Sequence, residues 1–120
     1  MMISGTDNFE REIFITLQIP GTHCWPKAKK SAPYLKHEHR HLFIIRVGSR
    51  VEHNDRHIEF MALRTVINDH LMKRWNKRLG LMQLGSMSCE ALAQELLEKF
   101  EYLNWVEVSE DGENGAWLSR

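Results

Sequence analysis

Three histidines fall within five residues at the start of an apolar segment, in the sequence KHEHRHLFIIRV that runs from Lys36 to Val47. Because side chains on a strand alternate between its two faces, His39 and His41 should point to the same side, with α-carbons about 7 Å apart. Two imidazoles in this arrangement can bind one metal ion, and zinc is the usual occupant of a nitrogen-rich site. The H-x-H pattern alone is a weak signal, since it also fits a polar strand end with solvated histidines.

A metal site needs a third ligand, and His23 is the histidine that lies upstream of this cluster, at the end of another apolar segment. Antiparallel pairing of the two segments would bring His23 beside His39 and His41. Three neutral histidines would leave a fourth position open, as catalytic zinc requires. His37 has the same parity as His39 and His41, so His23, His37 and His39 form an alternative ligand set.

The elements that must position these histidines are predicted from hydrophobic periodicity and turn residues. The first strand ends at Pro20-Gly21, a basic loop with four lysines spans 24–36, and Gly48 suggests a bulge in the second strand. The predicted order is ββααββ, with strands near 10–19, 39–53, 105–108 and 116–118 and helices near 59–78 and 88–100.

Two apolar stripes at three- and four-residue spacing predict the helices. Gly80 should end the first helix, and Ser88 has the position of an N-cap for the second. The first stripe consists of Phe60, Leu63, Ile67, Leu71 and Trp75, and the second of Leu92, Leu96 and Phe100.

Length and charge restrict the kind of protein. A chain of 120 residues is expected to form one domain, spanning 1–120. Its 16 basic and 16 acidic residues cancel, which argues against nucleic acid or an anionic membrane as a partner. No apolar run predicts a membrane span or a signal peptide, and the two cysteines, Cys24 and Cys89, are expected to be free thiols. These features predict a cytoplasmic protein.

Five motifs follow one another along most of the chain: His23, then HRHLF opening an apolar strand, IEF entering a helix, SCEALA, and VEVSEDGENGAW. Together they resemble the 6-pyruvoyl-tetrahydropterin synthase and 6-carboxytetrahydropterin synthase family. The resemblance implies a T-fold, an α+β domain in which a four-stranded antiparallel sheet carries two helices on one face. It also implies a homo-oligomer, in which subunits assemble into rings with ligand sites between them.

The same resemblance implies roles for individual residues. His23, His39 and His41 take the places of the family's zinc ligands, with Phe43 where a tyrosine is common. Glu110 matches a glutamate that grips the pterin ring, and a carboxylate can indeed accept two parallel N–H donors from a guanidine-like ring edge. Glu90 belongs to the helix-start motif. Both glutamates also have simpler explanations, Glu110 as a solvent-facing hairpin residue and Glu90 as an acidic residue in a first helical turn.

The chain departs from the family where catalysis would take place. The stretch SAPYLKHE before the H-x-H lacks the family's catalytic cysteine. Cys24 should face away from His23 if the strand is regular there, whereas Cys89 lies in a first helical turn, where the helix dipole would lower its pKa. Either thiol could replace the missing base. Asp69-His70 loosely resembles the family's Asp-His pair, which supports proton transfer.

Two classes of function follow from these matches and departures. The first is a zinc-dependent lyase that acts on a dihydroneopterin-triphosphate-like substrate and holds its phosphates with Lys27, Lys29, Lys30 and Lys36. The second is a catalytically inactive T-fold zinc protein that binds a pterin, purine or nucleotide ligand or a protein partner. The retained histidines favour the first class, and the missing cysteine favours the second.

Overall fold

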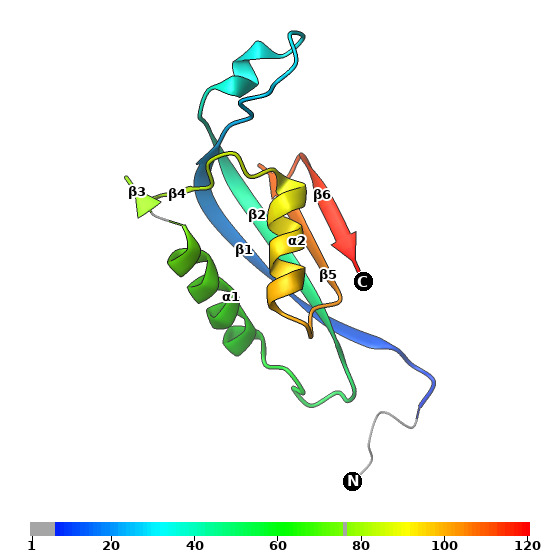
Figure 1. Cartoon of the computed structure of the whole chain (residues 1–120). Coiled ribbons are helices and arrows are strands. Elements are labelled where there is room, and N and C mark those ends of the chain that lie inside the picture. The colour runs from blue at the N-terminus through cyan, green and yellow to red at the C-terminus, as the bar shows by residue number, and fades with distance from the viewer. Residues whose placement is uncertain (1–6, 76) are drawn as a thin grey trace.

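Two long strands carry the histidines in the computed structural model, which describes residues 7–75 and 77–120 (Figure 1). β1 (Arg11–His23) and β2 (His39–Val51) pair antiparallel along their whole length. Apolar residues alternate along both strands, so that one face is buried and the other is largely exposed. The buried face presents Ile15, Leu17, Ile19, Phe43, Ile45 and Val47.

β1 does not end at Pro20-Gly21, as its turn-like sequence predicted, but continues to His23. Leu42 lies opposite Pro20, but its backbone groups point to the other side of β2, where its N–H donates to Asp111 Oδ1 and its C=O accepts the Asp111 N–H. The Pro20–Leu42 pair is therefore a non-hydrogen-bonded pair of the ladder, and the missing N–H of proline costs no β1–β2 hydrogen bond. This extension is what places His23 opposite His39.

The sheet is larger than the four antiparallel strands that were predicted. Among residues 7–75 and 77–120 it has six strands, in the order β3-β4-β1-β2-β5-β6. β1, β2, β5 and β6 are antiparallel as expected, but β4 adds to β1 in parallel, at Gly21 and Thr22. The two additional strands are β3 (Lys77–Arg78) and β4 (Leu81–Gln83), whereas β5 (Trp105–Glu110) and β6 (Asn114–Ser119) are the predicted C-terminal strands.

The first helix, α1 (Phe60–Arg74), begins where the sequence predicted but ends earlier. The Glu59 side chain caps it by accepting the backbone N–H groups of Met61 and Ala62. The last residues of the predicted helix, Lys77 and Arg78, instead form β3, which pairs with β4 in a hairpin. The turn residues of this hairpin, Leu79 and Gly80, both have positive φ angles, of 58° and 75°. Gly80 therefore serves a tight hairpin and not a helix end.

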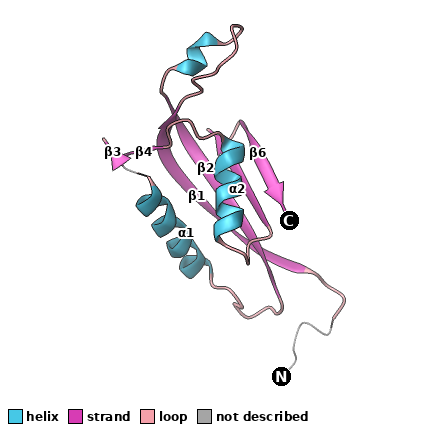
Figure 2. Ribbon diagram, in the orientation of Figure 1, coloured by secondary structure: helices cyan, strands magenta, loops and turns pink. Residues whose placement is uncertain are grey.

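The second helix, α2 (Cys89–Lys99), follows the prediction closely. Ser88 is its N-cap, because its hydroxyl accepts the Ala91 N–H at 3.0 Å. Both helices cover the same face of the sheet, α1 near β1 and α2 over β5 and β6 (Figures 1 and 2). The helix residues in the core are Leu63, Ile67 and Leu71 of α1 and Leu92, Ala93, Leu96 and Leu97 of α2. No helix in the described ranges has the length and apolar character needed to cross a membrane.

Gly48 does not form the bulge that its position suggested, because β2 stays in register with β1 on both sides of it. The Trp105 indole lies directly over this glycine, and a β-carbon added at Gly48 would be 2.1 Å from Trp105 Nε1. Gly48 therefore permits close packing of an aromatic ring on the sheet.

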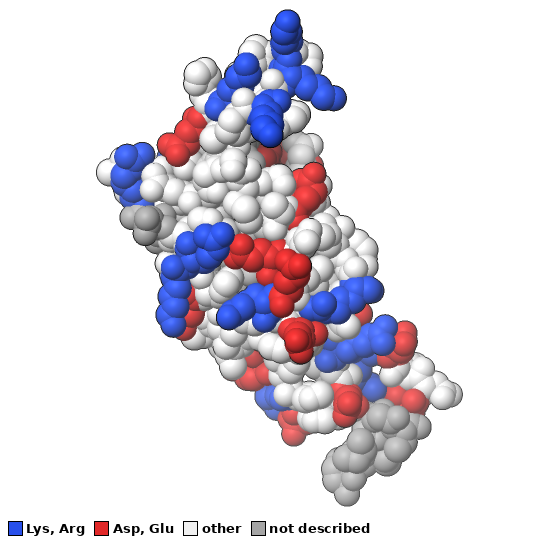
Figure 3. Space-filling model, viewed as in Figure 1, with Lys and Arg blue, Asp and Glu red and all other residues white. Residues whose placement is uncertain are grey.

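The segment 24–38 projects beyond the end of the sheet, between β1 and β2, and includes the short 3₁₀ helix η2 (Pro33–Lys36). Its lysines, Lys27, Lys29, Lys30 and Lys36, are all exposed. Basic side chains gather on this projection in Figure 3. The chain is neutral as a whole, but one end of it is locally basic.

Candidate metal centre

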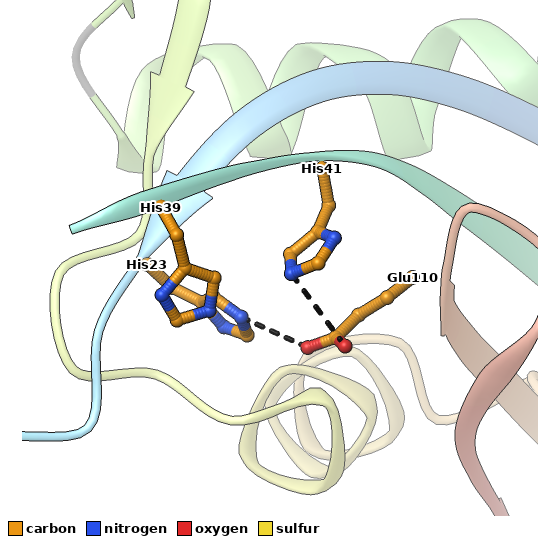
Figure 4. Close-up of side chains that lie close together, drawn as sticks. All are labelled: His23, His39, His41 and Glu110. Atoms are coloured by element: carbon orange, nitrogen blue, oxygen red, sulfur yellow. Dashed lines mark ion pairs between the residues drawn. The ribbon is translucent and has the colours of Figure 1, made fainter. Parts of the chain in front are cut away.

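Four side chains that carry metal-binding atoms meet at one end of the sheet, on the face that the helices cover. His23 lies opposite His39, and His41 follows two residues further along β2. Opposed residues in an antiparallel pair share a face, as do residues two apart on one strand. Glu110, the last residue of β5, lies opposite Phe43 of β2 and joins the same face. Three strands thus bring together His23, His39, His41 and Glu110 (Figure 4).

The ligand atoms of these four residues all lie within 4.8 Å of one another. His23 Nε2 is 2.9 Å from one carboxylate oxygen of Glu110, and His41 Nε2 is 3.6 Å from the other. Tetrahedral ligands at zinc-like bond lengths are about 3.3 Å apart, so small side-chain movements would suffice to place one ion among them. The group could therefore bind a metal ion.

A hydrogen bond at Nδ1 orients each of the three imidazoles. His23 Nδ1 lies 3.0 Å from the Met87 carbonyl oxygen, and His39 Nδ1 lies 2.9 Å from the His37 carbonyl oxygen. His41 Nδ1 lies 2.8 Å from an Asp111 carboxylate oxygen. These oxygens only accept, so each Nδ1 must carry the proton and donate it. With Nδ1 as the donor, Nε2 is the nitrogen that faces the cluster, and its lone pair can bind a metal ion when the ring is neutral.

Phe43 forms an apolar wall on one side of the site. Its side chain is fully buried, and its ring contacts His23 and His41 edge-on, with ring centroids 5.1 Å and 5.8 Å apart. An apolar wall limits water access and lowers the local dielectric constant, which strengthens electrostatic contacts at a metal ion. Phe43, which stands where the resemblance places a tyrosine, thus belongs to the core.

A cavity of about 650 Å³ adjoins the cluster and reaches the first turn of α2. Its walls include both carboxylates that the sequence proposed as ligand-binding residues, Glu90 and Glu110. Both cysteines also line it, so Cys24 opens onto the same space as His23, although regular alternation predicted that it would face away. Alternation does not extend to Cys24 because β1 ends at His23. The apolar part of the lining comes from Trp25, Leu35, Met87 and Ala116.

Cys89 is not the activated thiol that its place in a first helical turn suggested. Burial, together with the nearby carboxylates of Glu110 and Glu90, raises the pKa of the Cys89 thiol to about 12. Desolvation and negative neighbours outweigh the helix dipole here. Cys89 is therefore a neutral thiol at physiological pH.

Asp69 and His70 lie on α1, outside the residues that line the cavity. Asp69 is exposed. His70 Nε2 is 3.3 Å from a Glu95 carboxylate oxygen of α2, and its ring packs edge-on against Phe100. Within the described part of this chain, the pair is separate from the four-residue cluster, and His70 forms a polar contact between the two helices.

The structure distinguishes between the two ligand sets that the sequence left open. His41 belongs to the cluster, whereas His37 contributes its backbone carbonyl to His39 and has an exposed side chain. Asp111 was not foreseen at all. Hydrogen bonds from the Leu42 N–H and from His41 hold the pKa of the Asp111 carboxyl below its usual range. The signal that could have found Asp111 is a carboxylate directly after Glu110 in an Asp-Gly turn.

Comparison with known proteins gives no assignment: no protein-family model matches the chain, and no curated protein matches it.

Proposed function

We propose that this protein is a zinc-dependent protein of the tetrahydropterin synthase type, which binds one zinc ion per chain and a pterin- or purine-like ligand beside it. The observation that carries the proposal is the convergence of three oriented Nε2 atoms and one carboxylate on one point. Zinc fits this donor set because it favours four ligands, takes imidazole nitrogen readily and accepts carboxylate oxygen.

The cavity supports a small ring as the ligand. Its volume of about 650 Å³ lies within the range of ordinary small-molecule sites, and its walls combine apolar side chains with a few polar groups. Glu90 and Glu110 are acceptors for the N–H groups of such a ring. The T-fold and the ring-shaped homo-oligomer belong to the same proposal.

The reaction we propose is a lyase reaction on a dihydroneopterin-triphosphate-like substrate. Bound zinc would supply polarisation of the substrate's side-chain oxygens. The chain itself would orient the ring through its carboxylates and hold the phosphates near the exposed lysines of the projecting segment 24–38. Cys24 lines the cavity, and its thiolate form would accept the proton removed from the substrate.

A second candidate is a catalytically inactive zinc protein that binds the same class of ligand. The placement of the proposed proton-transfer groups favours it: Cys89 has a raised pKa, and Asp69 and His70 lie away from the cavity within the described residues. On this proposal the metal and the carboxylates bind the ligand, and no chemical step follows.

One experiment tests both candidates. Zinc-loaded protein is incubated with dihydroneopterin triphosphate while phosphate release is followed, and binding is measured by calorimetry under the same conditions. Phosphate release that is lost in His39→Ala supports the lyase. Binding without release supports the inactive protein. Neither binding nor release would contradict both candidates and leave the metal centre alone to be explained.

A further inference from the structure

We propose that Asp111 is a positioning residue of the metal centre, which holds His41 so that its Nε2 faces the ion. This inference rests on the proposed metal site and adds a residue to it. The carboxylate of Asp111 would not contact the metal, because it lies on the Nδ1 side of the His41 ring. Carboxylate–histidine–metal arrangements of this kind fix the ring orientation and increase the basicity of the ligand.

Two hydrogen bonds join Asp111 to β2, the strand that carries His41. One oxygen accepts the Leu42 N–H at 2.9 Å, and the Asp111 N–H donates to the Leu42 carbonyl at 2.7 Å. Asp111 has a φ angle of 59°, a left-handed conformation that aspartate tolerates better than most residues. The turn after β5 is thereby joined to β2 at the residue next to His41.

The second carboxylate oxygen of Asp111 accepts the His41 Nδ1–H at 2.8 Å. The Nδ1 partners of His23 and His39 are neutral backbone carbonyls, so His41 is the one member of this histidine set with an anionic partner at Nδ1. A charged acceptor gives the stronger hydrogen bond and makes the opposite ring nitrogen a better electron donor. We therefore expect His41 to depend on Asp111 for its strength as a ligand.

The turn also separates the tasks of two neighbouring acidic residues. Glu110 is the last residue of β5 and points into the cluster, where its oxygens face His23 and His41. Asp111 follows it and contacts Nδ1 of His41, on the side of the ring away from the cluster.

Three variants test the role of Asp111. Asp111→Asn keeps the size of the side chain and its tolerance for positive φ but removes the charge. Asp111→Gly removes the side chain without backbone strain at that φ angle. Glu113→Gln is the matched control, because Glu113 is an exposed acidic residue of the same turn and the substitution removes the same charge.

Zinc affinity is measured by competition with a chelator, the visible absorption of Co²⁺-loaded protein reports the coordination, and thermal unfolding in excess chelator reports the fold. We expect Asp111→Asn and Asp111→Gly to bind zinc about 10- to 100-fold more weakly than the parent, with an altered Co²⁺ spectrum. Glu113→Gln should stay within about twofold of the parent.

The outcomes separate this inference from the proposed function. If the parent binds zinc and both Asp111 variants bind it equally well, Asp111 has no positioning role, although the metal centre stands. If the variants lower the unfolding temperature in chelator but leave zinc affinity unchanged, Asp111 stabilises the fold and does not position a ligand. If the parent itself binds neither Zn²⁺ nor Co²⁺, the metal centre is wrong and the role of Asp111 is wrong with it.

Discussion

At the scale of single residues, Glu110 has two proposed roles that compete for the same oxygen atoms. Its two oxygens face His23 Nε2 and His41 Nε2, which is the geometry of a fourth metal ligand. The family resemblance instead assigns the carboxylate to the edge of a pterin ring. A carboxylate that binds a metal ion with one oxygen has at most the other free for a ring donor, so the two roles predict different effects of mutation.

Glu110→Gln is expected to weaken zinc binding by roughly tenfold or more if Glu110 is a metal ligand, because a neutral amide oxygen interacts less strongly with a cation. Chelator competition measures the zinc affinity, and calorimetry with a pterin measures ligand binding. Glu107→Gln is the control, since Glu107 lies on the same strand but pairs with Arg46. Unchanged zinc affinity with weaker pterin binding would assign Glu110 to the ring alone.

His39→Ala and His37→Ala should differ sharply, although the two histidines are only two residues apart. The structure places the His39 imidazole in the cluster but uses only the backbone carbonyl of His37, which alanine retains. We expect elemental analysis to find about one zinc per chain in the parent and in His37→Ala, and very little in His39→Ala. Equal loss of zinc in both variants would contradict the assigned ligand set.

The residue patterns that predicted the cluster are local or depend on strand pairing. The parity of His39 and His41 follows from strand geometry, and His23 joins them once β1 and β2 pair. Asp111 could not be predicted in this way. Its contact with His41 spans 70 residues and depends on a left-handed residue in a turn, which sequence periodicity does not report.

At the scale of elements, the N-terminus of α2 supports both the cavity and one candidate metal ligand, His23. Ser88 caps the helix, and the preceding residue, Met87, offers its carbonyl to His23. Cys89 and Glu90 then line the cavity from the first turn. The helix start therefore fixes several groups of the site at once.

Ser88→Ala should lower the free energy of unfolding by about 1 kcal/mol, because the Ala91 N–H loses its capping partner. Urea denaturation followed by circular dichroism measures this change. Ser86→Ala, at an exposed position of the same loop, is the matched control and should change stability by less than about 0.5 kcal/mol. A Ser88→Ala protein as stable as the Ser86→Ala protein would show that the cap contributes nothing.

The type and order of the main elements could be read from the sequence, but some boundaries could not. Alternation and helical periodicity identified β1, β2, both helices and the final hairpin. The helix predicted near 59–78 ends at Arg74, because the following residues pair as β3 and β4 at the edge of the sheet. Such pairing is a tertiary effect that overrides local helical pattern. The continuation of β1 through Pro20 is also a tertiary effect, because Pro20 lies opposite Leu42, whose backbone N–H points away from β1.

At the scale of the whole molecule, β6 is an edge strand with free hydrogen-bonding capacity. Leu42 and Gly48 of β2 direct their backbone groups toward the β5 side. Because hydrogen-bonded and non-hydrogen-bonded pairs alternate along an antiparallel ladder, this determines which residues of β5 and β6 direct their backbone groups toward which neighbouring strand. Through the β5–β6 register, Asn114, Ala116 and Leu118 then bond to β5. The residues between and after them, Gly115, Trp117 and Ser119, turn their N–H and C=O groups outward. Exposed groups of this kind favour pairing with another chain.

We predict that the protein forms a homo-oligomer in which the outer edge of β6 takes part, because outward backbone groups and the 58%-exposed Trp117 side chain lie together there. Light scattering at micromolar concentration should give a mass of several chains for the parent. Trp117→Pro removes an outward N–H without removing a β5–β6 hydrogen bond, and it should shift the protein toward smaller species. Trp117→Thr removes the same ring but keeps the N–H, so it separates the backbone contribution from the side-chain contribution.

Larger dissociation in Trp117→Pro than in Trp117→Thr would support strand pairing, and equal dissociation in both would assign the contact to the indole. A monomeric parent would contradict the prediction, because the edge of β6 would then be tolerated without a partner.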